Sequence, residues 1–297
     1  MDNIIEGKSF DEERALYGQH DITVKNCRFD GPADGESAFK EARCIRAEKN
    51  FYNLRYPFWH CTNLEVLGGE MTDKCRAALW YSENVNIQGL TMHGIKAVRE
   101  CANVSIKDSE IDSPEFGWFT RGMSMENCKA TSEYFMLKSS GLNFTGLEFS
   151  GKYSFQYVAD SVFENCNFDT KDAFWHAKNV LVKNCTVKGE YLAWYCENVT
   201  FENCTISGTQ PLCYCKGLKL VNCKMYDADL AFEKSEVQAD IKSHVESIKN
   251  PKSGCIKVAS LGSLIRDDTA SLADVSVGAV IPGSDPESVE GVGVALV

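Results

Sequence analysis

Aromatic side chains recur along the chain at a spacing that suits sugar binding. The five tryptophans occupy equivalent places in a nineteen-residue period, once an insertion of two residues before Trp80 is allowed for. Aromatic faces pack against the C–H faces of pyranose rings, so a regular series of them is a candidate surface for an extended carbohydrate. We name this series, with the arginine that falls in it, the tryptophan column: Trp59, Trp80, Arg99, Trp118, Trp175 and Trp194.

The residue that follows each member of this series forms a second series. Two glutamates and a lysine also occur at this position, and because such residues are rarely buried, it is the safer candidate for a solvent-facing surface. We name its aromatic and imidazole members, together with Glu100, the tyrosine column: His60, Tyr81, Glu100, Phe119, Tyr157, His176, Tyr195 and Tyr214.

Three carboxylates beside the two columns are candidates for acid–base chemistry. Asp172, Glu190 and Glu233 fall in nearby repeats, and paired carboxylates serve as acid and base in glycosidases. The same charges could instead form solvent-exposed ion pairs, such as Lys171 with Glu190, and the histidines could be structural. Whether the protein is an enzyme stays open, and no catalytic residue is assigned.

The sequence contains little evidence for a metal site or a cofactor site. Cys213 and Cys215, together with Cys196, could hold a metal, but the three thiols fit better as core residues. No Gly-x-Ser-x-Gly, His-Glu-x-x-His or dinucleotide fingerprint occurs, and the Gly-Lys-Ser at 7–9 lacks the upstream glycine of a phosphate loop. We therefore expect no metal and no cofactor.

A repeat of nineteen residues must position these side chains. Counting the first residue of each repeat as position zero, positions one and three are mostly apolar and the residues between them are mostly polar, as in a half-buried strand. Position five is mostly Asn, Gly or Asp, which suits a sharp corner in the backbone. Three short strands per repeat predict an all-β fold, a right-handed parallel β-helix of about eleven coils over residues 21–235. The repeats begin at Asp21, Cys44, Asn63, Asn84, Asn103, Gly122, Gly141, Asp160, Asn179, Asn198 and Gly217.

The two ends of the chain depart from the repeat. Ser9 and Glu12 have the spacing of a capping box and Gly18 follows, so residues 1–20 are expected to form a cap with a short helix over about Phe10–Tyr17. Irregular strands over residues 236–282 are expected to close the other end. Residues 283–297, rich in Gly, Ser and acidic side chains, are expected to form a flexible tail.

The orientation of the tryptophan column has two interpretations. Simple alternation along the third strand places the tryptophans inside and the tyrosine column outside, which makes the tryptophans core residues. A bulge would expose them, and Arg99 within the series favours exposure. If Phe58, Phe155 and Phe174, which precede the column, also face outward, the surface would need cover by the C-terminal segment, a second subunit or a ligand.

Composition narrows the possible partners and the cellular compartment. The formal net charge of −11 argues against nucleic acid, and no apolar run is long enough to cross a membrane. The N-terminal residues do not resemble a signal peptide, so we expect a cytoplasmic protein whose fourteen cysteines are reduced. Ten of these fall in two inward columns: Cys27, Cys128, Cys166, Cys185, Cys204 and Cys223 in one, and Cys61, Cys101, Cys196 and Cys215 in the other.

Short segments spread over most of the chain carry a resemblance to a known family. They are Glu13-Arg-Ala-Leu-Tyr17, Arg55-Tyr-Pro-Phe-Trp59, Arg76-Ala-Ala-Leu-Trp-Tyr81, Lys171-Asp-Ala-Phe-Trp175, Gly189-Glu-Tyr-Leu-Ala-Trp-Tyr195, Leu230-Ala-Phe-Glu233 and Asn250-Pro-Lys-Ser-Gly254. The chain resembles an uncharacterised bacterial family of single-stranded right-handed β-helix proteins of the pectin-lyase-like type. The resemblance implies the fold but no reaction, and the polysaccharide enzymes of the wider class are related by fold alone.

Two functions remain open at this stage. One is a β-helix protein that binds an extended carbohydrate along the two columns. The alternative is a non-enzymatic scaffold or oligomerisation module, a homo-oligomer, that uses the same face. An extracellular polysaccharide lyase is disfavoured because a signal peptide is not evident.

Overall fold

The structure is a computed structural model that describes residues 3–31, 35–270 and 275–279. The chain divides into two compact units, Met1–Ser154 and Phe155–Val297, which we call unit one and unit two. Secondary structure in the described residues consists of strands and turns, with no helix. Each unit is a parallel β-solenoid, because strands of successive coils pair in parallel.

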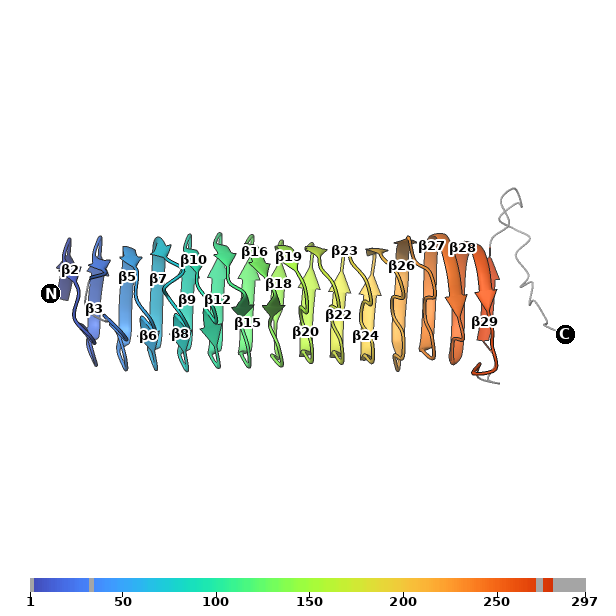
Figure 1. Cartoon of the computed structure of the whole chain (residues 1–297), viewed down its shortest axis with the longest axis horizontal. Helices are drawn as coiled ribbons and strands as arrows, with labels where there is room; N and C mark the ends of the chain where they lie inside the picture. The colour runs from blue at the N-terminus through green and yellow to red at the C-terminus, as the bar shows by residue number, and fades with distance from the viewer. Residues whose placement is uncertain (1–2, 32–34, 271–274, 280–297) are drawn as a thin grey trace. The chain divides into compact units, whose positions relative to one another are not determined.

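Unit one is built from strands that stack in chain order on three sides (Figure 1). The first side holds β1 (Asn3–Glu6), β3 (His20–Lys25), β5 (Arg43–Tyr52), β7 (Thr62–Met71), β9 (Glu83–Gln88), β12 (Ala102–Lys107), β15 (Arg121–Glu126) and β18 (Asn143–Thr145). The second side holds β2 (Ser9–Phe10), β4 (Arg28–Phe29), β10 (Thr91–His93), β13 (Glu110–Asp112), β16 (Lys129–Ser132), β19 (Glu148–Gly151) and the ends of β5 and β7. The third side holds β6 (Phe58–Trp59), β8 (Leu79–Trp80), β11 (Val98–Arg99), β14 (Glu115–Phe116) and β17 (Tyr134–Phe135).

Unit two repeats this plan with a shorter set of named strands. Its first side holds β20 (Ala159–Glu164), β22 (Lys178–Lys183), β24 (Glu197–Glu202), β26 (Leu218–Tyr226), β27 (Glu236–Lys249), β28 (Ser253–Ile265) and β29 (Val275–Ala279). Its second side holds β21 (Asn167–Asp169), β23 (Thr186–Lys188) and β25 (Thr205–Ser207). Its third side is formed by turns that carry Trp175 and Trp194.

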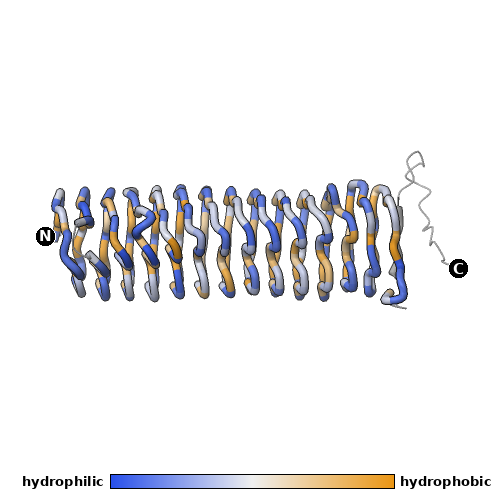
Figure 2. The backbone as a smooth tube through the Cα atoms, viewed as in Figure 1, coloured by the Kyte–Doolittle hydropathy of each residue, from blue (hydrophilic) through white to orange (hydrophobic). Residues whose placement is uncertain are grey.

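The core follows from the alternation that the repeat predicts. Ile45 pairs with Leu64 and Leu64 with Val85 in register, and all three side chains are buried while their neighbours along the strand are more exposed. Hydrophobic and hydrophilic stretches recur along the backbone of each unit (Figure 2). Each such fully buried side chain stabilises the fold by about 1.5–3 kcal/mol. One coil alone could not bury this face, so the stacking of coils supplies the core.

Asparagines at the corners stabilise the stack in a second way. Asn203 and Asn222 have φ angles of 53° and 51°, in the left-handed region that Asn tolerates better than most residues. The Asn222 side-chain amide donates to Asn203 Oδ1 at 2.8 Å, and Asn203 donates to Asn184 at 3.2 Å. The predicted corner residues therefore shape the backbone and also link successive coils.

The predicted N-terminal helix is wrong. Residues 13–18 form turns, in which Arg14 N donates to Glu36 O at 2.8 Å and Leu16 N to Ala38 O at 2.8 Å. These bonds reach the next coil instead of the preceding helical turn. A local capping signal is outweighed here because the segment lies on the solenoid and bonds to its neighbour.

The predicted number of coils is also too small, since the described residues hold about 14 turns and not eleven. Asn3–Glu6 pairs in register with Ile22–Lys25, which adds a coil before the first repeat. Beyond the repeats, β27, β28 and β29 continue the parallel stack, with bulges between Leu220 and Cys223 and between Ile241 and His244. The bulges disturb the nineteen-residue spacing without ending the solenoid. The predicted tail at 283–297 lies outside the described residues.

The cysteines are small, hydrogen-bonded core residues. All fourteen are free, and all except Cys44 and Cys255 are buried. Cys101 Sγ, for example, lies 3.5 Å from Leu79 O of the preceding coil and 3.2 Å from Arg99 O of its own coil, so its single S–H can donate to either carbonyl. Burial raises the pKa of Cys61 to about 12 and that of Cys101 to about 11, so these thiols stay protonated at neutral pH.

Candidate functional site

The backbone of the third side turns two consecutive side chains outward in each coil. Residues of the tyrosine column have φ angles in the left-handed region, such as 52° at Tyr81 and 60° at Tyr195. Such a residue interrupts the alternation of a strand, as a bulge does. The tryptophan before it is therefore partly exposed, and the residue after it, Ser82 or Cys196, is buried.

This geometry decides between the two interpretations of the tryptophan column: the tryptophans are not core residues, and they are partly exposed as a bulge would leave them. Trp59, Trp80, Trp118, Trp175 and Trp194 are each partly exposed. The residues that precede the column point inward instead: Phe58, Phe155 and Phe174 are fully buried. The idea that these phenylalanines face outward and need a cover is therefore wrong.

In unit one, the rings of the tryptophan column contact one another and two cations. The Trp59 and Trp80 rings are stacked with centroids 5.3 Å apart and planes at 13°. The Arg99 guanidinium carbon lies 5.9 Å from the centroids of both Trp80 and Trp118. Lys40 Nζ lies 4.2 Å from the Trp59 centroid. A cation over an aromatic face is attracted by the ring, so this series holds its members in place.

The tyrosine column of unit one runs beside it. The His60 and Tyr81 rings meet edge to face with centroids 5.2 Å apart, and Tyr81 stacks on Trp80 at 5.2 Å. Arg99 Nε donates to Glu100 Oε1 at 2.9 Å. The predicted residues Trp59, His60, Trp80, Tyr81, Arg99 and Glu100 therefore form one continuous surface.

Glu100 is ionised on this surface. Partial burial raises its pKa, but hydrogen bonds from Tyr81 and Arg99 outweigh burial, and the net effect is a lowered pKa. The nearby Trp80 indole lowers it a little further, although its N–H makes no hydrogen bond of normal geometry. The same carboxylate raises the pKa of the Tyr81 hydroxyl, which stays protonated and can donate.

A cleft of about 230 Å³ opens beside the tryptophan column of unit one. Lys96, one of its cations, lies 3.7 Å from Glu115. Sequence reasoning missed this cleft because its residues come from three successive coils on either side of the insertion before Trp80. Its lining residues are Tyr56, Arg76, Ala77, Trp80, Lys96 and Arg99.

In unit two, the tyrosine column is an uninterrupted stack. Tyr157 and His176 are parallel within 8° at 4.7 Å, His176 and Tyr195 within 9° at 5.1 Å, and Tyr195 and Tyr214 within 13° at 4.9 Å. Tyr157 and Tyr195 each keep nearly half of their surface exposed. Burial and then the hydrogen bond to Glu233, 3.1 Å away, raise the pKa of Tyr214 to about 12.

The tryptophans of unit two stand next to this stack and are fixed by the backbone. Trp175 Nε1 donates to Tyr191 O and Trp194 Nε1 to Gln210 O, both at 2.7 Å. In unit one, Trp118 makes the equivalent bond to Tyr134 O at 3.0 Å. The indole N–H groups of Trp59 and Trp80 are also buried but have no hydrogen-bond partner.

The candidate carboxylates are not arranged as an exposed acid–base pair. Lys171 Nζ lies 2.9 Å from Glu190, the ion pair considered as an alternative to catalysis. Asp172 is only 7% exposed, and burial raises its pKa. Glu233 is held by Tyr214 and by Lys249, whose Nζ lies 3.1 Å away. Glu190 and Glu233 are therefore occupied by structural partners, and Asp172 is largely buried.

The cysteines do not form a metal centre either. Cys196, Cys213 and Cys215 are buried, and Cys215 Sγ donates to Ala193 O at 3.0 Å. In the part of the chain that the structure describes, no group of three or more His, Cys, Asp or Glu side chains could hold a metal ion. Over the same residues, no helix has the length and apolar character needed to cross a membrane.

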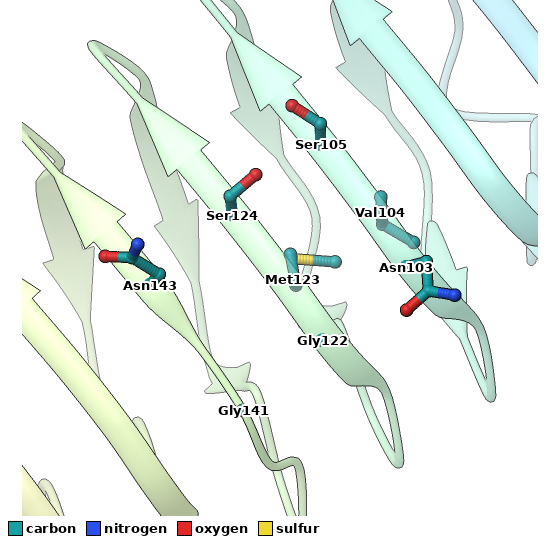
Figure 3. Close-up of a pocket in the computed structure, with 8 residues that line it drawn as sticks. All are labelled: Asn103, Val104, Ser105, Gly122, Met123, Ser124, Gly141 and Asn143. Carbon is teal, nitrogen blue, oxygen red and sulfur yellow. The ribbon is translucent and has the colours of Figure 1, made fainter.

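A shallow depression of about 360 Å³ lies on the first side of unit one (Figure 3). It forms where two glycines interrupt a series of corner asparagines, in which Asn103 donates to Asn84 at 3.1 Å and Asn84 to Asn63 at 3.0 Å. The replacement of Asn by Gly in two successive repeats is a signal that sequence reasoning did not use. Without a titratable side chain, the depression offers no catalytic group; it is lined by Asn103, Val104, Ser105, Gly122, Met123, Ser124, Gly141 and Asn143.

Comparisons with known proteins give a family and distant structural similarity. A family model described as a protein of unknown function, DUF3737, matches residues 3–277. No curated protein matches the chain. The A-module of the mannuronan C-5 epimerase AlgE4 from Azotobacter vinelandii is similar at 9% identity and a TM-score of 0.29, over 91% of this chain and 88% of that chain. A trypsin-treated form of QnrB1, a plasmid-mediated fluoroquinolone resistance protein, is similar at 13% identity and a TM-score of 0.18, over 76% of this chain and 92% of that chain.

Proposed function

The chain belongs to the DUF3737 family of proteins of unknown function, and from the side chains on its own surface we propose that it binds an extended carbohydrate along the tryptophan and tyrosine columns. The observation that carries this proposal is the partial exposure of both columns. A buried tryptophan series would serve packing alone, whereas rings that remain in contact with water in successive coils offer a repeating surface. The repeat of about 4.8 Å between coils suits a ligand that is itself a linear polymer.

The stacking of the rings leaves part of each face available. Rings in contact lie about 3.5 Å apart. Centroid separations of 4.7 Å between Tyr157 and His176 and 5.3 Å between Trp175 and Trp194 therefore mean that neighbouring rings are offset. Offset rings present slanted faces and edges to solvent, and the tyrosines add hydroxyl groups that can bind sugar hydroxyls.

The side chains of this surface fit a carbohydrate-binding role better than a catalytic role. A glycosidase needs one carboxyl group that can donate a proton and another that can act as base or nucleophile beside the substrate. Glu190 is paired with Lys171, and Asp172 is too buried to reach a surface ligand. The rings, in contrast, are already held in position, so little entropy is lost on binding.

A glycan array with matched variants tests the proposal. We expect the wild-type protein to bind at least one class of extended glycan, and the replacement of Trp175, His176 and Tyr195 by Ala together to abolish binding to unit two. The double variant Val221→Ser with Tyr226→Ala is the control, because it removes similarly exposed side chains, each 47% exposed, from β26. If the wild-type protein binds no glycan, the proposal fails.

The same surface supports a second candidate, an interface between copies of the chain. Tyr81, Phe119 and Tyr134 of unit one are 37–43% exposed, and such aromatic side chains are enriched in protein interfaces. Light scattering after size-exclusion chromatography separates the two candidates. A stable dimer that Tyr81→Glu and Phe119→Glu convert to a monomer favours the interface, whereas a monomer whose columns bind glycans favours the first proposal.

A further inference from the structure

We infer that the cleft beside Trp80 in unit one binds an anionic group, so that the ligand is an acidic saccharide that carries carboxylate or sulfate groups. This inference rests on the proposed function and adds a ligand class to it. Its basis is a local excess of cations that have free donors, in a chain whose net charge is −11.

The cations around the tryptophan column outnumber their carboxylate partners. Arg99 pairs with Glu100, and Lys96 lies 3.7 Å from Glu115. Arg76, which lines the cleft, and Lys40, which lies over Trp59, have no carboxylate partner among the described residues. Two positive charges are therefore left without a partner on this surface. Elsewhere in unit one, pairs such as Lys107 with Glu126 neutralise each other across neighbouring coils.

Arg99 is arranged so that its outer donors remain available. Glu100 takes the Nε–H at 2.9 Å, and the flat guanidinium lies between the rings of Trp80 and Trp118. Among the described residues, no acceptor is hydrogen-bonded to the two terminal nitrogens of Arg99. A guanidinium in this state can bind a carboxylate or sulfate through two parallel hydrogen bonds.

An unsatisfied donor beside the cleft also points to a ligand that brings acceptors. Trp118, Trp175 and Trp194 donate their indole N–H to a backbone carbonyl, but the buried N–H groups of Trp59 and Trp80 make no hydrogen bond of normal geometry. Such groups are rare in folded proteins because they lose their water without compensation. Trp80 lines the cleft, so a small rotation of its ring on binding would let the N–H donate to a ligand oxygen.

The test compares polymers that share one backbone and differ only in charge. Affinity electrophoresis of the full chain is run in hydroxyethyl cellulose, carboxymethyl cellulose and cellulose sulfate, with the glycan array as a second panel. We expect binding to one or both anionic polymers, at least about fivefold tighter than to the neutral one and weaker at high salt. A comparison of binding to carboxymethyl cellulose with binding to cellulose sulfate shows whether the protein recognises carboxylate groups, sulfate groups or both.

Matched arginine variants locate the site. Arg76→Gln is expected to weaken the binding of the anionic polymer by about fivefold or more, while Arg76→Lys retains part of it. Arg43→Gln, which removes an exposed arginine from the first side of unit one, is expected to change binding less than about twofold. Thermal melts of all three variants establish that each is folded.

The outcomes of this experiment are distinguishable. If glycans bind without preference for charge, the inference fails and the proposed function stands. If anionic polymers bind but Arg76→Gln and Arg43→Gln have equal effects, the cleft is not the site and the inference fails. If no glycan binds at all, the proposed function fails as well.

Discussion

The indole ring of Trp175 lies parallel to that of Trp194, with centroids 5.3 Å apart and planes 3° apart. Each indole also donates its N–H to a backbone carbonyl of the next coil at 2.7 Å. The rings are thus fixed by a stacking contact and by a hydrogen bond, although both remain partly exposed. Rings that are solvent-exposed and already held in position would lose little conformational freedom if a ligand bound to them.

Removal of the second ring of this pair should destabilise the protein measurably. Trp194→Ala loses the ring contact, worth about 0.5–1.5 kcal/mol, and a hydrogen bond worth about 1 kcal/mol. We expect the free energy of unfolding in urea to fall by about 1–3 kcal/mol. Trp194→Phe keeps a ring without the N–H and should lose about half as much. Tyr226→Ala, the control, should stay within about 0.5 kcal/mol of the wild type, and an equal effect of Trp194→Ala would contradict the prediction.

The backbone at Tyr195 gives a second prediction. Its φ angle of 60° is unfavourable for branched side chains and tolerated by Asn. We expect Tyr195→Asn to be more stable than Tyr195→Val by about 1–2 kcal/mol in urea denaturation, although Val is the more apolar residue. At Lys219, an exposed residue within β26, the same two substitutions should rank in the opposite order, because Val favours strands. The same order at both positions would show that the left-handed angle does not matter.

The third side also explains why part of the site could not be predicted from sequence. The repeat places Trp59 above Trp80 and Trp175 above Trp194, and the structure confirms both contacts. The repeat does not predict which way these rings face. Tyr81 and Tyr195 adopt a left-handed backbone conformation, and a tyrosine in the sequence gives no sign of that conformation. Strand alternation fails at such residues, and of the two orientations that the sequence left open for the tryptophans, the structure has the one that a bulge would produce, with the rings partly exposed.

The structure of the N-terminal segment and the cleft beside Trp80 could not be predicted from the sequence for a different reason. The capping pattern at Ser9 and Glu12 is a local signal, whereas the bonds of Arg14 and Leu16 to the next coil depend on tertiary structure. The cleft likewise joins Arg76, Lys96 and Arg99 across coils of unequal length. A regular repeat predicts which residues of one column contact each other. Insertions that change the length of a coil make contacts between residues of different columns hard to predict.

The burial of the thiols predicts a simple pattern of chemical labelling. Cys44 is exposed and Cys255 is half-buried, while the other twelve cysteines are buried. We expect a thiol reagent such as DTNB at pH 8 to modify Cys44 rapidly and Cys255 more slowly in the folded protein, and all fourteen after denaturation. The Cys44→Ser variant should lose the rapid phase alone. Rapid modification of several thiols in the folded protein would be inconsistent with the two buried columns.

The raised thiol pKa values also predict a loss of stability at alkaline pH. Burial raises the pKa of Cys61 to about 12 from an ordinary value near 9, so between these limits the unfolded chain releases a proton that the folded chain retains. The stabilisation is complete below about pH 9 and is lost as the pH rises, by up to about 1.4 kcal/mol per pH unit for each such thiol.

Urea denaturation at pH 8.5 to 10.5 measures this dependence, and a pair of variants isolates the thiol from the lysines and tyrosines that titrate in the same range. Cys61→Ala should make the decline with pH less steep by the share of one thiol, whatever its effect on stability at pH 8.5. Cys44→Ala should leave the slope unchanged, because folding does not bury the Cys44 side chain. If Cys61→Ala and Cys44→Ala give the same slope as the wild type, the folded protein does not protect the Cys61 thiol from ionisation.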